Sequence, residues 1–374
     1  MAGLYVHIPF CVSKCAYCAF YSMPSLKMKG AFMKALLSEM ASRVPYLNGE
    51  QVNTVYFGGG TPSILSVEEL DVILRAIRQH YRVSDQAEFT LEANPDTLSL
   101  DYLSALRKAG VNRLSIGIQS FFDEDLRYLS RRHDSTHARQ CVGWARQAGF
   151  DNLSLDLIYG LPTATAERWR QNLDLFFETG AQHLSAYALT VEPNTILEKQ
   201  IATGKALPVR EDDAVRDYEI LVDRAAKEGF VHYEISNFAR PGFRSKHNCS
   251  YWNRTPYIGF GPAAHSFDGN SRQWNVAHLQ HYIDGIEAGH PDFEQETLTP
   301  EQRYDEYVMT TLRTMWGIDL KYMKRELGER FSTYCERQAE SLVSQGRLTR
   351  TNEFLHLDDR QMLFADGIAA ELFI

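Results

Sequence analysis

The sequence predicts an α/β protein with a partial (β/α)6 barrel, TIM-like in its strand–helix order, followed by a small helical domain at its C-terminus. Three observations support this prediction. Short β-branched and aromatic runs alternate about six times with helix-like stretches, polar residues and glycines recur just after those runs, and the pattern becomes mainly helical from about residue 298. Such alternation is typical of parallel strands joined by helical crossovers.

The apolar runs are nearly continuous, as in strands that are buried on both faces. One of the intervening helices begins with Ser66 and Glu69, which have the spacing of a capping box. The expected strands are residues 4–8, 54–57, 88–92, 113–118, 153–158 and 183–189. The expected helices are residues 30–44, 66–80, 99–109, 134–148 and 165–179.

A doubly wound sheet is the competing architecture, since a complete barrel would need two more strand–helix units. The positions of polar residues favour the barrel. Cysteines follow the first strand, and residues at or after the next four strand ends are 58–61, Glu92 with Asn94, Gln119, and Asp156. Functional groups at successive strand ends meet at one mouth in a barrel.

We divide the chain into a barrel over residues 1–235, a connecting region over 236–297, and a helical domain over 298–374. A helix around 211–229 and a strand over 231–236 lead into the connecting region. The last domain shows helices near 300–316, 331–345 and 359–372, with two short strands before the last helix. This order is typical of a winged helix, and a plain packing domain is the alternative.

The composition excludes several classes of protein. The 374 residues carry 39 Lys and Arg against 48 Asp and Glu, a net charge of -9, which argues against general nucleic-acid binding. No apolar run reaches the roughly 18 residues of a membrane span, and the N-terminus lacks the pattern of a secretory signal. We therefore expect a cytoplasmic protein.

Three cysteines, Cys11, Cys15 and Cys18, have the spacing C-x3-C-x2-C after the first strand. A structural zinc site usually has four ligands, whereas three thiolates suit a [4Fe–4S] cluster with one iron left open. A zinc knuckle and accidental clustering are the alternatives. Cys141 and Cys335 occur in helix-like segments and are expected to be buried thiols.

Residues 7–18, with the pattern H-I-P-F-C-x3-C-x-Y-C, resemble the signature loop of the radical S-adenosylmethionine (SAM) superfamily. Within it, the chain is similar to the branch that contains oxygen-independent coproporphyrinogen III oxidases and related heme chaperones. The resemblance implies a radical SAM barrel, a cluster on the three cysteines, and SAM bound to the open iron. The cofactor supplies the difficult chemistry, and the protein positions it.

The resemblance also implies the residues that contact SAM. The glycine-rich run G-G-G-T-P at residues 58–62 matches the motif at the methionine amino group, where glycine lets the backbone approach the ligand. An arginine suits the methionine carboxylate and a carboxylate suits a ribose hydroxyl, with Arg132 an alternative to Arg131. The expected residues are Tyr5, Tyr17, Gly59, Gly60, Thr61, Glu92, Gln119, Arg131 and Asp156.

A second motif, H-N-x-x-Y-W at residues 247–252, resembles the one that marks the heme chaperones. A neutral imidazole is a good axial ligand of heme iron, and aromatic rings can stack on the porphyrin. His247 is the expected ligand; a core histidine, or ligation by Cys249 or His265, is the alternative. The motif residues expected at heme are His247, Asn248, Tyr251 and Trp252, with Arg244 and Lys246 near the propionates.

Two features differ from the oxidases. Their further cysteine is replaced by Phe20, and a chain that reaches its first strand by Leu4 leaves no room for their N-terminal extension. We therefore expect a heme chaperone, with a coproporphyrinogen III dehydrogenase or another radical SAM enzyme as alternatives. The resemblance implies acceptors among respiratory-chain hemoproteins, which would bring the chain to the membrane surface through its acceptor. We expect a monomer or weak dimer, and the motifs leave open whether SAM is cleaved.

Overall fold

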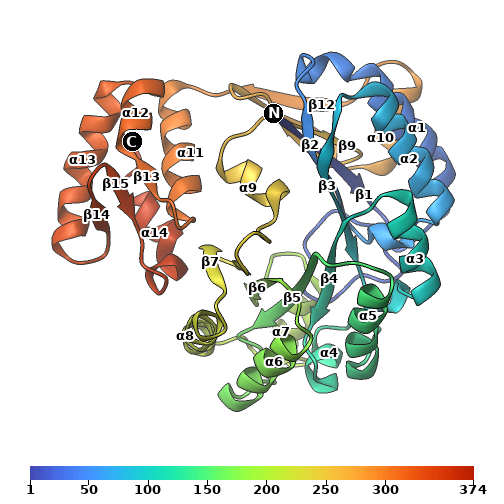
Figure 1. Ribbon diagram of the computed structural model, residues 1–374, viewed down its shortest axis with the longest axis horizontal. Helices are drawn as coiled ribbons and strands as arrows, with labels where there is room; N and C mark the ends of the chain where they lie inside the picture. Colours follow the sequence, from blue (N-terminus) through green and yellow to red (C-terminus); the bar gives the residue numbers. More distant parts are fainter.

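The computed structural model describes residues 1–374 and places six parallel strands side by side in chain order (Figure 1). A doubly wound sheet would reverse its strand order, so the unbroken order confirms the partial barrel. The strands are β1 (Ala2–Ile8), β2 (Val52–Gly59), β3 (Val83–Ala93), β4 (Arg113–Gln119), β5 (Leu153–Tyr159) and β6 (His183–Ala188).

Helices alternate with these strands and cover the outer face of the sheet (Figure 1). All five expected helices are present, and Ser66 caps the second by accepting a bond from the Glu69 backbone N–H at 3.2 Å. Helices α4 and α7 were missed because six or seven residues are too few to show a helical period. The helices are α1 (Lys29–Ser42), α2 (Val67–His80), α3 (Leu100–Ala109), α4 (Asp123–Tyr128), α5 (Ser135–Gln147), α6 (Ala166–Glu178), α7 (Ile196–Ala202) and α8 (Glu211–Lys227), with 3-10 turns at η1 (Val44–Leu47), η2 (Pro62–Ile64) and η3 (Pro95–Thr97).

The same sheet continues beyond both ends of the barrel. Beside β6 lie the antiparallel strands β8 and β7; beside β1 lies the parallel strand β9, followed by an antiparallel meander. Residues 236–297 thus supply five strands to the main sheet. The elements are β7 (Val231–Glu234), β8 (Asn237–Ala239), α9 (Lys246–Trp252), β9 (Tyr257–Phe260), β10 (His265–Phe267), β11 (Ser271–Asn275), α10 (Leu279–Glu287) and β12 (Phe293–Thr297).

Helix α9 lies against the barrel at the end opposite to the strand carboxyl ends. The backbone N–H groups of Lys246 and His247 donate to the Glu88 carboxylate at 3.0 and 3.2 Å. Glu88 pairs in register with Thr54, near the amino-terminal end of β2, and His247 contacts Thr54 as well. Helix α9 therefore packs into the amino-terminal end of the barrel.

The C-terminal domain lies to one side of the barrel (Figure 1). It has its own hydrophobic core, separate from the main core. Its three antiparallel strands have the order β13-β15-β14, and its helix–strand–helix–helix–strand–strand sequence is that of a winged helix. Cys335 is buried in this core and Cys141 in the main one, as expected. The elements are α11 (Pro300–Leu312), β13 (Ile318–Asp319), α12 (Leu320–Glu326), α13 (Glu329–Ser344), β14 (Thr349–Thr351), β15 (Phe354–His356), η4 (Gln361–Phe364) and α14 (Ala365–Ala370).

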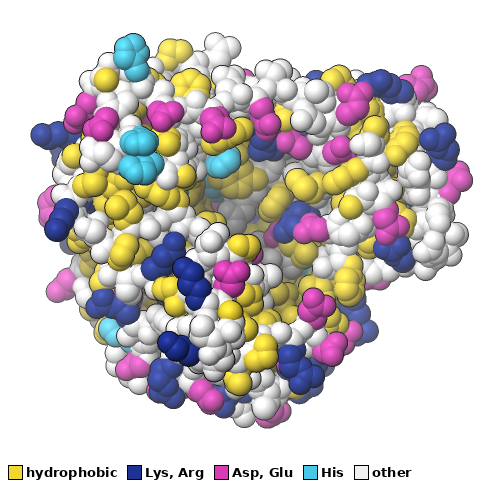
Figure 2. All heavy atoms as spheres, turned by 180° about the vertical axis from the view of Figure 1, so that it is seen from behind, with side chains coloured by type: hydrophobic (Ala, Val, Ile, Leu, Met, Phe, Trp, Pro, Cys, Tyr) yellow, Lys and Arg dark blue, Asp and Glu magenta, His cyan; other side chains and the backbone are white.

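The molecular surface is hollowed near the centre of the face shown in Figure 2, and hydrophobic side chains gather around this hollow. Charged side chains of both signs are scattered over the rest of that face. None of the helices combines the length and the apolar composition that crossing a bilayer requires.

Candidate functional site

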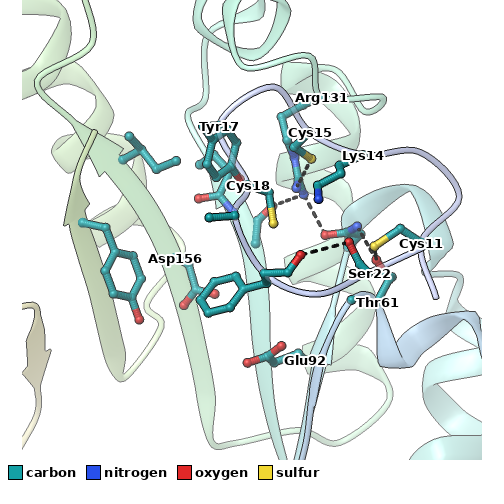
Figure 3. Close-up of a pocket in the computed structure, with 18 of the residues that line it drawn as sticks. Cys11, Lys14, Cys15, Tyr17, Cys18, Ser22, Thr61, Glu92, Arg131 and Asp156 are labelled. Atoms are coloured by element: carbon teal, nitrogen blue, oxygen red, sulfur yellow. Dashed lines mark hydrogen bonds between the residues drawn. The ribbon is translucent and has the colours of Figure 1, made fainter. Parts of the chain in front are cut away.

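A pocket of about 570 Å³ opens at the carboxyl-terminal ends of the barrel strands, where a barrel presents its functional groups. The loop between β1 and α1 covers one side of it, and Glu92 and Asp156 lie on the strands that form its wall (Figure 3). The residues predicted for the cluster and for SAM line this pocket, except Tyr5: Cys11, Cys15, Tyr17, Cys18, Gly59, Gly60, Thr61, Glu92, Gln119, Arg131 and Asp156.

Cys11, Cys15 and Cys18 are carried by the loop that covers the pocket (Figure 3). The Thr61 hydroxyl donates to the Cys11 sulfur at 3.5 Å, and Nη1 of Arg131 donates to the Cys15 sulfur at 3.4 Å. Burial raises the pKa of the Cys18 thiol, and the charges of the other two cysteines raise it further, because the three lie near one another. No three His, Cys, Asp or Glu side chains converge on a position for a single metal ion.

The donor set of this pocket fits an iron–sulfur cluster with one open iron. Three thiols line the pocket without a fourth cysteine, and thiolates are the usual ligands of such clusters. Beside Cys15, the buried Nε of Arg131 has no hydrogen-bond partner in the protein. A buried guanidinium with an unused N–H fits a small ligand that carries a carboxylate.

Gly60 allows the cysteine loop to pass over the end of β2. A Cβ at this position would lie 2.6 Å from the Phe10 carbonyl oxygen and 3.0 Å from the Cys11 sulfur. The backbone N–H groups of Gly60 and Thr61 donate to Ile8 and Phe10, each at 2.8 Å. The glycine-rich run therefore supports the cysteine loop in addition to lining the pocket.

Of the two adjacent arginines, Arg131 faces the pocket. Its Nη2 donates to the Asn94 side-chain oxygen at 2.8 Å and to the Gly117 carbonyl at 2.7 Å, whereas the Arg132 side chain is 53% exposed. The Asn94 amide in turn donates to the Thr61 hydroxyl at 3.1 Å. Asn94, which the sequence marked only as a strand-end residue, thus connects the arginine to the glycine-rich run.

Glu92 and Asp156 are half-buried carboxyl groups on β3 and β5, which lie on either side of β4. The Tyr56 hydroxyl donates to Glu92 at 2.7 Å, and the Ser115 hydroxyl donates to Asp156 at 3.2 Å. Burial raises the pKa of Glu92 to about 7 and that of Asp156 to about 6. Asp156 does not end its strand as expected, because β5 continues to Tyr159, so the carboxylate lies inside the barrel.

Three other predicted residues occupy different environments. Gln119 is buried and has a left-handed backbone, with φ of 65°, which is a type of strain common at functional sites. Tyr17 lines the pocket, and burial raises the pKa of its phenol. Tyr5 lies outside the pocket lining, with its hydroxyl 3.1 Å from Nδ1 of His7 and its ring stacked on Tyr56.

His247 is buried at the other end of the barrel, with 1% of its surface exposed. Its Nδ1 lies 2.9 Å from the Thr54 hydroxyl, and its Nε2 lies 2.8 Å from the Tyr251 hydroxyl. Burial lowers the pKa of the imidazole to about 3, so the ring is neutral. Both ring nitrogens are occupied, which is the environment of a core histidine, and a bond to iron would require Tyr251 to release Nε2.

The H-N-x-x-Y-W residues do not share one surface. Tyr251 points at His247, whereas Trp252 lines a second cavity, which is shared with the C-terminal domain. Asn248 is half-buried, and its backbone N–H donates to the Ser245 cap of α9 at 3.2 Å. The helix therefore separates the motif into a face toward the barrel and a face toward the C-terminal domain.

The alternative iron ligands occupy different positions. Cys249 is half-buried on α9, and burial raises the pKa of its thiol to about 11. His265 is exposed on β10, with its ring 5.8 Å from that of Trp274. Neither of them lines the barrel-mouth pocket.

Sequence reasoning missed Tyr56, Ser115 and Tyr187. Tyr56 and Ser115 donate hydrogen bonds to the two carboxyl groups, and Tyr187 lines the pocket from β6. Side chains on one strand alternate between two faces, so positions two or four residues from a predicted site residue were the available signal. That signal identifies many inward positions and does not distinguish a site residue from a core residue.

Comparisons with known proteins agree with this geometry. Residues 5–176 match the model of the radical SAM superfamily, and residues 298–364 match that of the HemN C-terminal domain. The chain is 35% identical over 373 residues to the heme chaperone HemW of Bacillus subtilis, covering 98% of each chain, and 33% identical to that of Escherichia coli, covering 100% of this chain and 98% of the relative. The structure of the E. coli coproporphyrinogen III oxidase HemN, a radical SAM enzyme, has the same fold, with a TM-score of 0.86, 23% identity, and coverage of 100% of this chain and 90% of HemN.

Proposed function

The chain belongs to the heme chaperone HemW family, and on this premise we propose that it binds heme and delivers it to apo-hemoproteins. The observation that carries the proposal is the match to the Bacillus subtilis HemW, which spans 98% of both chains at 35% identity. Besides heme, the cofactors are a [4Fe–4S] cluster and SAM, as in the superfamily whose model matches residues 5–176. When bound, the cluster is a source of single electrons for SAM.

The residues of the barrel-mouth pocket have distinct tasks in this proposal. Cys11, Cys15 and Cys18 hold the cluster, because they are the three thiols of the pocket. Arg131 binds the methionine carboxylate of SAM through its unused N–H, held in place by Asn94.

Two carboxyl groups of the pocket would bind the ribose of SAM. Glu92 and Asp156 would accept hydrogen bonds from its hydroxyls, since both carboxyl groups line the pocket. Tyr17, Gly59, Gly60, Thr61 and Gln119 surround the cofactor, and Tyr5 supports the wall from behind.

Helix α9 is the heme-binding element in this proposal. Its residues Asn248 and Trp252 contact the heme, and His247 and Tyr251 hold the helix against the barrel. The hypothesis that His247 ligates the iron remains open to test, because it needs the bond between Nε2 and Tyr251 to break. The acceptors are hemoproteins of the respiratory chain, and the protein works in the cytoplasm, reaching the membrane surface only through them.

Hemin titration of the anaerobically reconstituted full-length protein, followed by absorbance, tests heme binding. The loaded protein is then mixed with rising concentrations of an apo-hemoprotein whose heme spectrum differs. A chaperone that hands heme over directly shows a transfer rate that increases with acceptor concentration. Passive release instead gives a rate limited by dissociation, which heme-loaded serum albumin shows as the control.

Two outcomes would overturn the proposal. The first is a lack of saturable heme binding by the wild-type protein. The second is conversion of coproporphyrinogen III to its divinyl product when SAM and a reductant are supplied, which would make the chain an oxidase. In place of the further cysteine that an oxidase would carry, position 20 is a phenylalanine that lines the pocket and is 72% exposed.

A further inference from the structure

A second cavity, of about 240 Å³, lies between the end of α9 and the C-terminal domain. Trp252, at the end of α9, forms one wall, and Trp316 and Phe354 of the C-terminal domain face the same cavity. Trp316 and Phe354 are 37% and 43% exposed, so the cavity is an open groove. We call it the α9 groove.

The lining of the α9 groove is rich in aromatic rings. Besides the three residues above it contains Tyr307 and Tyr322, whose rings are stacked with centroids 5.1 Å apart. The indole N–H of Trp252 is buried and has no hydrogen-bond partner. Buried donors without a partner are rare, and this one lies in a cavity wall, where a ligand can supply the acceptor.

A cation lies at the edge of this aromatic surface. The guanidinium carbon of Arg244 is 5.3 Å from the centroid of the Trp316 ring. Arg244 has no carboxylate partner, unlike Arg313, which lies over Trp252 and pairs with Glu234 and Asp366. Arg244 lies outside the groove lining, against its Trp316 wall, and there adds a guanidinium that is free to bind an anion.

The face of α9 toward the barrel does not offer comparable space. His247 is buried among Thr54, Tyr56 and Tyr251, with both ring nitrogens occupied, its ring stacked on Tyr56 and edge-on to Tyr251. A macrocycle could reach that imidazole only if α9 left the barrel. The groove on the other face is open as the molecule stands.

We propose that the α9 groove is the heme site, with the macrocycle between Trp252 and Trp316 and a propionate bound by Arg244. This inference rests on the proposed function and deepens it by assigning the C-terminal domain one wall of the heme site. A planar apolar ring with acidic substituents is the ligand that aromatic walls beside a free guanidinium fit. An open groove of this volume covers only part of a macrocycle, which leaves an edge of the heme accessible to an acceptor.

The test uses the full-length reconstituted protein, with hemin and hemin dimethyl ester as the probes. Trp316→Ala is expected to weaken hemin binding about tenfold or more, because it removes one aromatic wall. Arg244→Glu is expected to weaken hemin binding by a similar factor while leaving binding of the uncharged ester nearly unchanged. Trp144→Ala, which removes a half-buried indole from α5 outside the groove, is the matched control and should bind hemin like the wild type.

These binding measurements distinguish a failure of the proposed function from a failure of the groove assignment. If the wild type shows no saturable hemin binding, the proposed function fails. If the wild type binds and both groove variants bind equally well, the groove assignment is overturned and the function stands. Trp316→Leu is a second variant that keeps an apolar side chain for folding. A full content of cluster iron in each variant, measured before hemin is added, shows that the barrel is intact. A lower affinity for hemin then reports on the groove.

Discussion

The imidazole of His247 is stacked on the phenol ring of Tyr56, with ring centroids 5.0 Å apart and planes inclined by 22°. The hydroxyl of the same tyrosine donates a 2.7 Å hydrogen bond to Glu92, which lines the barrel-mouth pocket. One side chain thus contacts both the α9 motif and the wall of the pocket. The two functional regions lie at opposite ends of the barrel and share this contact.

His247→Ala is expected to lower the free energy of unfolding by about 2–4 kcal/mol, since it removes a stacked ring and leaves two buried hydroxyls without a partner. In the proposed heme site the groove, and not the imidazole, holds the heme, so the spectrum of bound heme should stay the same. Urea unfolding and the heme absorption spectrum measure the two effects. Tyr251→Phe is the companion variant, and a changed heme spectrum in both well-folded variants would identify His247 as the ligand.

Glu92→Gln is expected to change how stability depends on pH. The folded-state pKa of about 7 lies above the ordinary value of 4.5, so the folded protein holds a proton that the unfolded chain releases. The contribution of Glu92 to stability is therefore complete below about pH 4.5 and is lost as the pH rises through about 7. Relative to the wild type, the neutral glutamine should gain up to roughly 3 kcal/mol between about pH 5 and about pH 8. Urea unfolding of the apo-protein at both pH values measures this, and parallel profiles would contradict it.

Arg131→Lys should weaken SAM binding about tenfold or more, because lysine cannot keep the bonds to Asn94 and Gly117 while also pairing with a carboxylate. Arg132→Lys, the neighbouring exposed position, provides the control and should bind SAM like the wild type. Isothermal titration of the reconstituted proteins measures both affinities. An equal loss of SAM affinity in both variants would show that Arg131 does not bind the methionine carboxylate.

Gly60→Ala should reduce the iron bound after reconstitution, since its Cβ would press on the Phe10 carbonyl and the Cys11 sulfur. Gly30→Ala is the matched control, because a Cβ there meets nothing within 4 Å. Iron analysis of both variants, reconstituted side by side, measures the effect. A full iron content in Gly60→Ala would mean that the cysteine loop accommodates the added Cβ and still binds the cluster.

Replacement of Cys11, Cys15 and Cys18 by alanine is expected to abolish the visible absorption of the cluster and the bound iron and sulfide. Cys249→Ala changes a cysteine outside this pocket and should retain the full cluster. Absorption spectra and iron analysis compare the two proteins. A four-iron complement in the triple variant would refute the ligand assignment.

Features encoded over short distances in the chain were predictable. The alternation of strands and helices follows from hydrophobic period, and the cysteine loop and the glycine-rich run each occupy a few consecutive residues. Their strand-end positions were enough to bring them to one mouth, as the shared pocket confirms. Helices α4 and α12 were not predicted, because each is too short to show a helical period.

The direction of individual side chains was not predictable in the same way. Arg131 and Arg132 are chemically equal neighbours, and the left-handed backbone of Ser130, with φ of 56°, precedes the residue that points inward. Asp156 was assigned to a strand end, whereas the length of β5 places it within the barrel. Such choices depend on contacts between strands that are distant in sequence.

The α9 motif shows the same division most clearly. Its six residues are contiguous, and the sequence alone predicted that they act together. Packing against Thr54 and Glu88 of the barrel turns His247 and Tyr251 inward and leaves Trp252 facing Trp316 of the C-terminal domain. Local composition specifies helices, strands and contiguous loops, because these depend on near neighbours. The groove depends on segments more than fifty residues apart in the chain, and only their packing brings these together.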